Sequence, residues 1–90
     1  MDYKVKDNAL IIELDERASA QLIFHVEGDR LYLDSTYTPQ AYRGRGVGGR
    51  LMLAAVDYAS KKRLRIVPVC GFSVAYFSRH AEYADHLWKG

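Results

Sequence analysis

The segment that most constrains this chain runs from Arg43 to Gly49, with the sequence RGRGVGG, and it places four glycines within six positions. It follows a stretch rich in tyrosine, leucine and threonine, and Pro39 prevents that stretch from continuing as a paired strand. An apolar run with helical spacing begins directly after it. The glycines therefore mark the junction between a strand and a helix.

The helix after the glycines is predicted to extend from Val47 to about Lys62. Its apolar residues recur at the spacing of one helical face, at Val47, Leu51, Ala54, Ala55 and Tyr58. Basic residues near its end favour a helix C-terminus. The β-branched run from Leu64 to Cys70 predicts a strand, and a strand that follows a crossover helix should lie parallel to the strand before that helix.

Upstream of the glycines, the sequence predicts three strands that pair as an antiparallel meander. In residues 9–14, Leu10, Ile12 and Leu14 alternate with Ile11 and Glu13, and every even position from Ala18 to Val26 is apolar. The segment from Arg30 to Tyr37 is the third predicted strand. Gly28 lies between the second and third strands and can adopt the positive φ that a hairpin turn requires.

Downstream of Gly71, the segment from Phe72 to Arg79 is predicted to be a helix with Val74, Phe77 and Ser78 inward. Residues 82–88 are predicted to form another short helical turn, in which Leu87 and Trp88 cover a hydrophobic edge or meet a partner subunit. The elements predict one domain, residues 1–90, of the α/β (α+β) class. It is a mixed sheet, in which an antiparallel N-terminal meander is followed by a β-α-β parallel crossover and short C-terminal helices.

Composition narrows the class of protein. Thirteen basic and eleven acidic residues give a net charge of +2, which is too balanced to favour nucleic acid or an anionic membrane as the partner. The single cysteine, Cys70, cannot form an intramolecular disulfide, which fits a reducing cytoplasm. The first six residues are polar, and no apolar run reaches the ~18 residues that span a bilayer, so we expect neither a secretion signal nor a membrane helix. The histidines lack a metal-ligand spacing, so no metal site is expected.

The position of the glycine segment favours an anion site. The first amides of a helix lack intrahelical partners and carry about half a positive charge, so glycines there let a phosphate approach the backbone. The segment lacks the Lys-Ser or Lys-Thr of a P-loop, and a single following strand leaves no room for a dinucleotide-binding sheet. The competing interpretation is that the glycines relieve crowding where the helix packs on the sheet. Gly48 and Gly49 argue for a ligand, because each costs up to ~1 kcal/mol relative to alanine in a helix.

The same segment resembles the acyl-CoA signature of the GNAT superfamily of N-acetyltransferases, with Arg43, Gly46 and Gly48 at the signature positions. Thr36 to Pro39, Val67 to Cys70 and Arg79 to Asp85 extend the resemblance to small single-domain GNAT-like proteins. It covers nearly the whole chain and is weakest over the first 25 residues. The pair Ser35-Thr36 stands where the family commonly has His-Thr, which removes a candidate base, and Gly71 stands where proline is usual.

The resemblance implies that acetyl-CoA lies between two parallel strands that diverge at their C-terminal ends. Pro68 has no N–H, so pairing between the third and fourth predicted strands should fail near it. The backbone groups left unpaired from Asp34 to Tyr37 would then bond the pantetheine amides, with Ser35, Thr36 and Tyr37 as the predicted cofactor-binding residues. The pyrophosphate would lie on Arg43, Gly44, Arg45, Gly46, Val47, Gly48 and Gly49.

Acetyl transfer from a thioester needs a neutral amine, an oxyanion donor and a proton for the departing thiolate. Cys70, at the end of the diverging strand, is either an acyl-accepting nucleophile or part of the thioester pocket, and the competing interpretation is a buried small hydrophobe. Tyr76 stands where GNAT enzymes often place a tyrosine that protonates the CoA sulfur, and its alternative is core packing.

No general base is identified. His80 and Glu82 are candidate bases or else surface and capping residues, whereas His25 and His86 are expected to be solvated. The first hypothesis is an acetyl-CoA-dependent N-acetyltransferase acting on an unidentified amine, with a protein or peptide amine favoured, as a monomer or a homodimer. The second is a CoA-binding module with little or no transferase activity. The third, which the low net charge disfavours, is a nucleic-acid-binding module.

Overall fold

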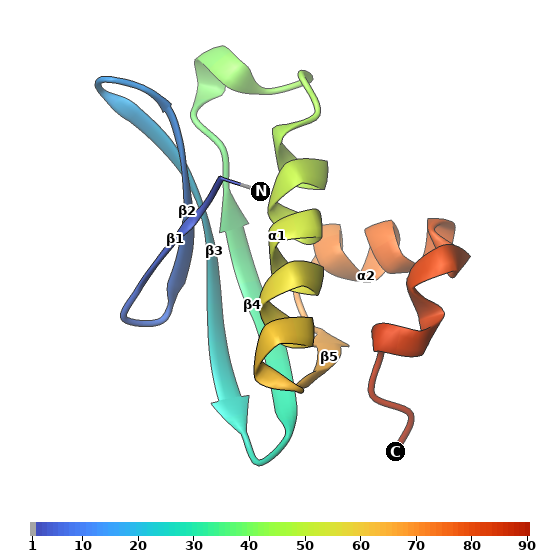
Figure 1. The fold of residues 1–90 in the computed structure, drawn as a ribbon. Coiled ribbons are helices and arrows are strands. Elements are labelled where there is room, and N and C mark those ends of the chain that lie inside the picture. Colours follow the sequence, from blue (N-terminus) through green and yellow to red (C-terminus); the bar gives the residue numbers. More distant parts are fainter. Residues whose placement is uncertain (1) are drawn as a thin grey trace.

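The computed structural model describes residues 2–90, and Met1 lies outside the described part. Within that part, five strands form one sheet in the order β1-β2-β3-β4-β5 (Figure 1). Short 3-10 helices span Gln40–Tyr42 and Ala81–His86. The other elements are β1 (Lys4–Lys6), β2 (Ala9–Asp15), β3 (Ala18–Glu27), β4 (Arg30–Tyr37), α1 (Val47–Lys62), β5 (Arg65–Pro68) and α2 (Gly71–Arg79).

The strands pair in antiparallel fashion from β1 to β4, and β4 and β5 are parallel because α1 crosses over between them. The antiparallel meander, the parallel crossover and both ends of α1 are confirmed. The fourth predicted strand is shorter than expected and covers only Arg65–Pro68. No pattern predicts β1, whose three residues are exposed and are held only by pairing with β2.

The hydrophobic core lies between α1 and one face of the sheet. The sheet contributes the alternating apolar residues of its strands, and α1 contributes the face that its spacing predicts, including the fully buried Leu51, Ala54 and Ala55. Tyr58 is only partly buried, and its ring lies 5.4 Å from that of Phe24. Because α1 is fixed along this face, its N-terminus is held at the same end of the sheet as the end of β4 (Figure 1).

The orientation of α2 differs from the prediction at two of three residues. Phe77 is buried as expected, but Val74 is 50% exposed and Ser78 is also exposed. Ser73 is fully buried instead, and its Oγ donates to the Cys70 carbonyl at 2.9 Å. A small hydroxyl that bonds its own helix start can be buried without an unpaired polar atom, so it replaces Val74 on the inner face.

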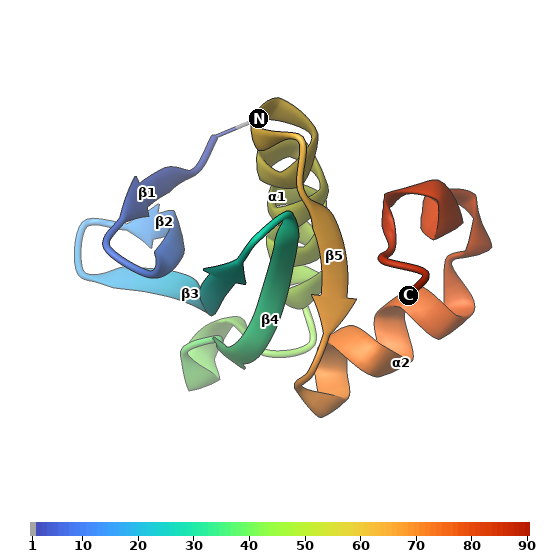
Figure 2. The ribbon, with the colours of Figure 1, turned by 90° about the horizontal axis from the view of Figure 1, so that it is seen from below.

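The C-terminal residues close the free edge of β5. Leu87 pairs with Ile66, and the Trp88 N–H donates to the Ile66 carbonyl at 2.9 Å. Leu87 packs against the core, while Trp88 is 43% exposed. Viewed from below, α2 and the C-terminal turn lie beyond the β5 edge (Figure 2). Neither described helix is both long and apolar enough to cross a membrane.

Candidate functional site

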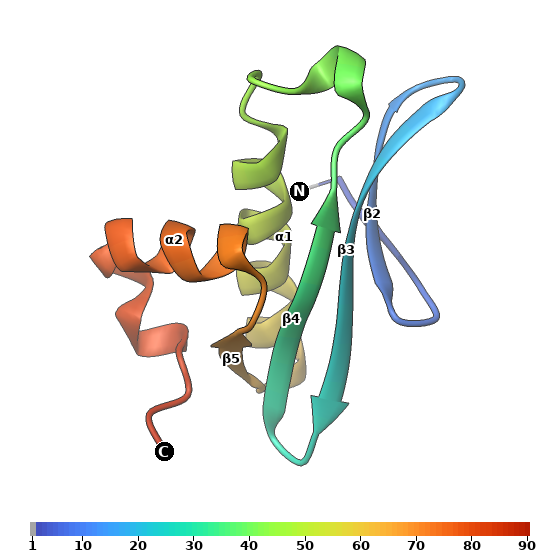
Figure 3. The same cartoon turned by 180° about the vertical axis from the view of Figure 1, so that it is seen from behind.

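The parallel strands β4 and β5 separate part-way along their length. Their pairing runs from Arg30 opposite Arg65 to Leu33 opposite Pro68, and then stops. The N–H groups of Val69 and Cys70 both donate to the Leu33 carbonyl, at 3.1 and 3.0 Å. Beyond this point β4 continues without β5 beside it (Figure 3). The expectation that pairing fails near Pro68 is therefore confirmed, but the missing N–H is not its cause. Arg65 and Val69 donate toward β4, to the carbonyls of Asp29 and Leu33, whereas the alternating residue Ile66 accepts from Trp88 on the outer edge, so a Pro68 N–H would also point away from β4.

The start of α1 has the backbone geometry of an anion site. Gly44 and Gly46 both have φ of +79°, in the left-handed region that favours glycine, and Gly46 is the N-cap. No side chain among residues 2–90 caps this end of the helix. The first intrahelical bond is donated by the Arg50 N–H to the Gly46 carbonyl, at 3.2 Å. The N–H groups of residues 47–49 therefore lie ahead of the helical ladder, and a helix N-terminus attracts negative charge.

Gly48 has a packing role, and Gly49 does not. A Cβ on Gly48 would lie 2.9 Å from both Cε atoms of Phe72, and one on Gly49 would lie 3.7 Å from Tyr76 Cε1. Phe72 and Tyr76 are one turn apart on α2 and rest on the first turn of α1. Crowding thus accounts for the glycine at position 48, although the neighbour is α2 and not the sheet. Gly49 has room for a methyl group.

A pocket of about 460 Å³ opens between the end of β4 and the start of α1. Its lining includes eight of the ten predicted cofactor-binding residues, and Ser35 and Arg45 are the two outside it. Three lining residues were not predicted: Thr38, Tyr42 and Phe72. The predicted residues that line it are Thr36, Tyr37, Arg43, Gly44, Gly46, Val47, Gly48 and Gly49.

One wall of this pocket is held by contacts with the β2–β3 hairpin. The Tyr42 hydroxyl donates to the Asp15 carboxylate, which raises the pKa of Tyr42 and lowers the pKa of Asp15. The Arg45 guanidinium lies 5.7 Å from the centre of the Tyr42 ring. Arg43 Nε donates to the Thr38 carbonyl at 3.0 Å, which ties the glycine segment back to the end of β4. Both arginines therefore lie close to the pocket with defined partners.

Cys70 lies where β5 ends and α2 begins, and it does not line the pocket. Its side chain is half-buried, and its thiol donates to Ser73 Oγ at 3.3 Å. Because its N–H donates to Leu33, the residue is fixed at the point where the two strands separate. Cys70 follows the end of β5 and is the N-cap of α2, and its chemical role stays a prediction.

Tyr76 also lies outside the pocket lining, within a group of aromatic rings. Its ring is stacked on His80 at 4.0 Å and meets the edge of Phe77 at 5.3 Å. Burial raises the pKa of the Tyr76 phenol, and Tyr83 and Glu82 raise it further. The structure therefore brings Tyr76 against α1 and His80, and its role as a proton donor stays a prediction.

The expectation for His25 changes, and that for His80 does not. His25 is not simply solvated, because both ring nitrogens contact carboxylates: Nδ1 lies 2.6 Å from Asp34 and Nε2 lies 3.1 Å from Glu27. His80 Nδ1 lies 3.4 Å from Glu82, and this contact contributes to the lowered pKa of that carboxyl, after a backbone hydrogen bond. Among residues 2–90 no group of three or more His, Cys, Asp or Glu side chains is arranged to hold a metal ion.

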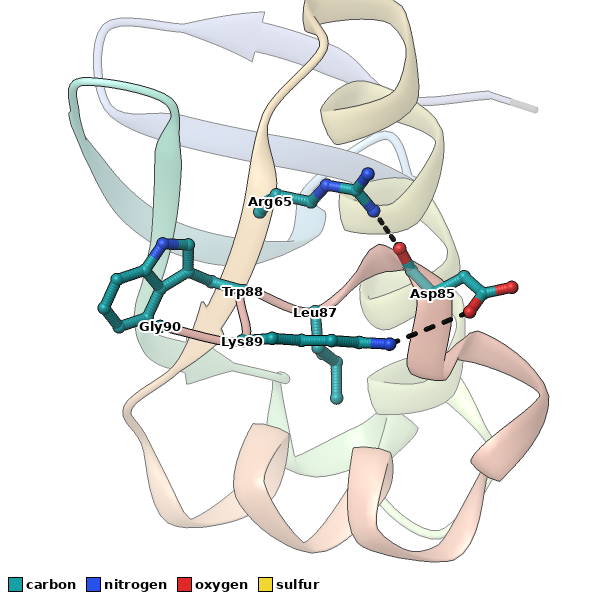
Figure 4. A pocket seen from close by; sticks show the side chains of 6 residues that line it. All are labelled: Arg65, Asp85, Leu87, Trp88, Lys89 and Gly90. Atoms are coloured by element: carbon teal, nitrogen blue, oxygen red, sulfur yellow. Dashed lines mark hydrogen bonds and ion pairs between the residues drawn. The ribbon is translucent and has the colours of Figure 1, made fainter.

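A second pocket, of about 440 Å³, lies at the other end of the molecule (Figure 4). Arg65, Asp85, Leu87, Trp88, Lys89 and Gly90 line it. The Arg65 guanidinium donates to the Asp85 carbonyl, and the Lys89 ammonium lies 3.9 Å from the Asp85 carboxylate. Both cations thus have a partner within the chain, and no glycine-lined helix start faces this pocket. The candidate site is therefore the pocket at the start of α1.

Comparisons with known proteins agree with this assignment. The family model described as GCN5-related N-acetyl-transferase matches residues 2–86. Protein NATD1 of chicken (Gallus gallus) is 32% identical over 71 residues, which are 76% of this chain. The chain spans 64% of the length of that relative. A solution structure of a GCN5-like candidate N-acetyltransferase from Staphylococcus aureus superposes with a TM-score of 0.77 at 25% identity, over 99% of this chain and 89% of that one.

Proposed function

Because this chain belongs to the GCN5-related N-acetyltransferase family, we propose that it binds acetyl-CoA and transfers the acetyl group to an amine. One observation carries the proposal. The uncapped start of α1 and the end of β4, which is paired with β3 but no longer with β5, line the same pocket. A ligand with a diphosphate and an amide-bearing arm needs such a pair of features side by side.

The residues present fit the two halves of acetyl-CoA. The N–H groups of residues 47–49 and the left-handed Gly44 and Gly46 would hold the pyrophosphate, with Arg43 and Arg45 adding charge. The edge of β4 from Ser35 to Tyr37 that faces away from β3 would bond the amides of the pantetheine arm. When bound, acetyl-CoA supplies a thioester whose acetyl carbon accepts the amine.

Two side chains are proposed to act on the thioester end of the ligand: Cys70, at the strand separation, and Tyr76, beside Gly49 at the start of α1. The Tyr76 phenol is protonated at neutral pH even at the ordinary tyrosine pKa, and burial raises its pKa further, so it carries a proton that it would give to the departing sulfur. Cys70 either accepts the acetyl group or lines the space around the thioester. The acceptor is proposed to be an exposed amine of a protein or peptide, and the protein is proposed to act in the cytoplasm as a monomer or a homodimer.

A specific observation favours a second candidate function. Neither Cys70 nor Tyr76 lines the pocket, and Ser35 stands where the family commonly has histidine. A protein that holds acetyl-CoA but turns it over slowly or not at all would fit these positions. The two functions share the binding step and differ only in turnover.

The binding step is tested by calorimetry with acetyl-CoA, for which we expect a dissociation constant of about 1 µM or below. Gly46→Glu places a carboxylate in the proposed phosphate site and should abolish measurable binding. Gly28→Glu is the matched control: its φ is +59°, no atom lies within 4 Å of the added Cβ, and it is far from the pocket. Both variants carry a similar backbone strain of about 1–3 kcal/mol, so a difference in binding reports the site.

Wild-type protein that does not bind acetyl-CoA would contradict both candidate functions, as would equal loss of binding in the two variants. Turnover then separates the candidates. Release of free CoA in the presence of small amines, lysine side chains and peptide N-termini supports the transferase. Binding without turnover on the whole panel supports the acetyl-CoA-holding protein.

A further inference from the structure

The bend that separates β4 from β5 coincides with an irregularity on the other side of β4. Phe24 pairs with Leu33, and the residue before it in β3, Ile23, pairs with Ser35. Asp34 is therefore an extra residue in β4. This is a β-bulge, which bends a strand and increases its twist. Leu33 is also the last residue of β4 that pairs with β5. The bulge therefore lies where β4 turns away and the pocket edge begins.

The side chain of this extra residue is held by His25. The distance between Asp34 Oδ2 and His25 Nδ1 is 2.6 Å, and the second ring nitrogen lies 3.1 Å from Glu27. The imidazole is also stacked on Tyr32, with ring centres 4.5 Å apart and planes 8° apart. The imidazole is therefore fixed in the plane of its ring by two carboxylates and across the plane by an aromatic face.

This cluster lies on the opposite face of the sheet from α1. Phe24 and Leu33 are buried in the core, so side chains that alternate with them, including His25, point to the other face. Neither His25 nor Asp34 lines the pocket at the start of α1. Any effect of the cluster on ligand binding must pass through the backbone of β4.

We propose that His25 is a positioning residue for the edge of β4 that binds the cofactor. By holding Asp34, it fixes the bulge and therefore the direction of residues 35–37. This inference rests on the proposed function, since it concerns the strand edge assigned to the pantetheine arm.

Proton binding at His25 should change the position of residues 35–37 and therefore the affinity for acetyl-CoA. The hydrogen bond to Asp34 is the largest cause of the raised pKa of His25, and Glu27 adds to it. Tyr32 faces the ring, with the Arg30 guanidinium 5.7 Å from the Tyr32 ring centre. The turn ahead of β2 carries Asp7, beside Asn8, whose carbonyl accepts from Phe24. Because the pKa of His25 is raised, the ion pair between protonated His25 and Asp34 is fully formed below pH 6.5. It is lost as pH rises through the pKa of His25 in the folded state.

The test is calorimetry of acetyl-CoA binding between pH 5.5 and pH 8.5 with the full chain. His25→Gln and Asp34→Asn should each bind about three- to tenfold more weakly than wild type at pH 6, a loss typical of residues that act through others. The gap should narrow as pH rises through the folded-state pKa of His25, because the wild-type imidazole then loses its positive charge. The phosphates of the ligand titrate equally for every variant, so the ratio to wild type isolates the protein.

Glu27→Gln is the control, because Glu27 contacts the same imidazole but lies outside the bulge. It should keep wild-type affinity at pH 6 within about twofold and move the wild-type pH midpoint downward, because one stabilising carboxylate is lost. If wild type binds but His25→Gln and Asp34→Asn match it at every pH, this inference is overturned and the proposed function stands. If wild type does not bind acetyl-CoA, both are overturned.

Discussion

The contact between Gly48 and Phe72 makes an unusual prediction for a helical glycine, because alanine there should destabilise the fold. Replacing glycine by alanine inside a helix ordinarily stabilises it by up to about 1 kcal/mol. At this position the new Cβ would lie 2.9 Å from both Cε atoms of Phe72, well inside normal contact. Phe72 is 43% exposed, so its ring can move outward, but it then leaves its packing surface on α1.

The magnitude follows from two opposing terms. Overpacking at a well-packed contact costs about 1–3 kcal/mol, and the helix propensity of alanine returns at most about 1 kcal/mol. We therefore expect Gly48→Ala to lower the free energy of unfolding by about 1 kcal/mol. In a Phe72→Ala background the steric term disappears, and the same substitution should raise the free energy of unfolding by about 0.5–1 kcal/mol. The sign of the effect should reverse.

The assay is urea unfolding of wild type, the two single variants and the double variant, analysed as a double-mutant cycle. Gly49→Ala is the matched control in the same helical turn, because its Cβ would be 3.7 Å from Tyr76 Cε1, an ordinary contact. It should be neutral or stabilising by up to about 1 kcal/mol. The reasoning is refuted if Gly48→Ala changes stability by the same amount with and without Phe72.

Three further predictions concern local contacts. In Tyr42→Phe the pKa of the Asp15 carboxyl should rise toward its ordinary value, measured by NMR titration, because the Tyr42 hydroxyl is the main cause of its lowering; an unchanged pKa contradicts the contact. Burial and the Asp57 carboxylate raise the pKa of Tyr3 to about 12, so Tyr3 stabilises the fold below pH 10 and this stability is lost as pH rises toward 12. Tyr3→Phe should lack that alkaline loss in unfolding experiments, and an identical pH profile would count against it. Val74→Ser should change the free energy of unfolding by less than about 0.5 kcal/mol, because Val74 is exposed, and a larger loss would show that it packs inward.

Strands and helices whose apolar residues recur at a regular spacing were predictable from the sequence. Elements that depend on contacts with another segment were not. The alternation of Ala18 to Val26 and the helical spacing from Val47 directly reflect which face meets the core. By contrast, the strand Lys4–Lys6 is exposed on both faces and exists because β2 pairs with it. The inward face of α2 depends on the bond from Ser73 to the Cys70 carbonyl, which no spacing reveals.

The candidate site divides in the same way. Glycine acts locally, so the left-handed Gly46 was predictable from the residue type. The place where β4 and β5 separate was also predicted correctly, at Pro68, but the N–H that proline lacks would face away from β4 and does not explain it. The contact between Phe72 and Gly48 joins two helices and has no local signal. The contact between His25 and Asp34 did have a local signal. The hairpin around Gly28 sets His25 opposite Tyr32, and Asp34 lies two positions after Tyr32 on the same face of β4.

The central claim is that the start of α1 and the free edge of β4 together hold acetyl-CoA. It is tested most directly by following the backbone amide signals of the full chain by NMR while acetyl-CoA is added. The account predicts that the largest shifts occur at residues 44–49 and 35–37, with little change at Arg65 and Asp85. Shifts concentrated in the pocket around Arg65 and Asp85, or no shifts at all, would contradict it.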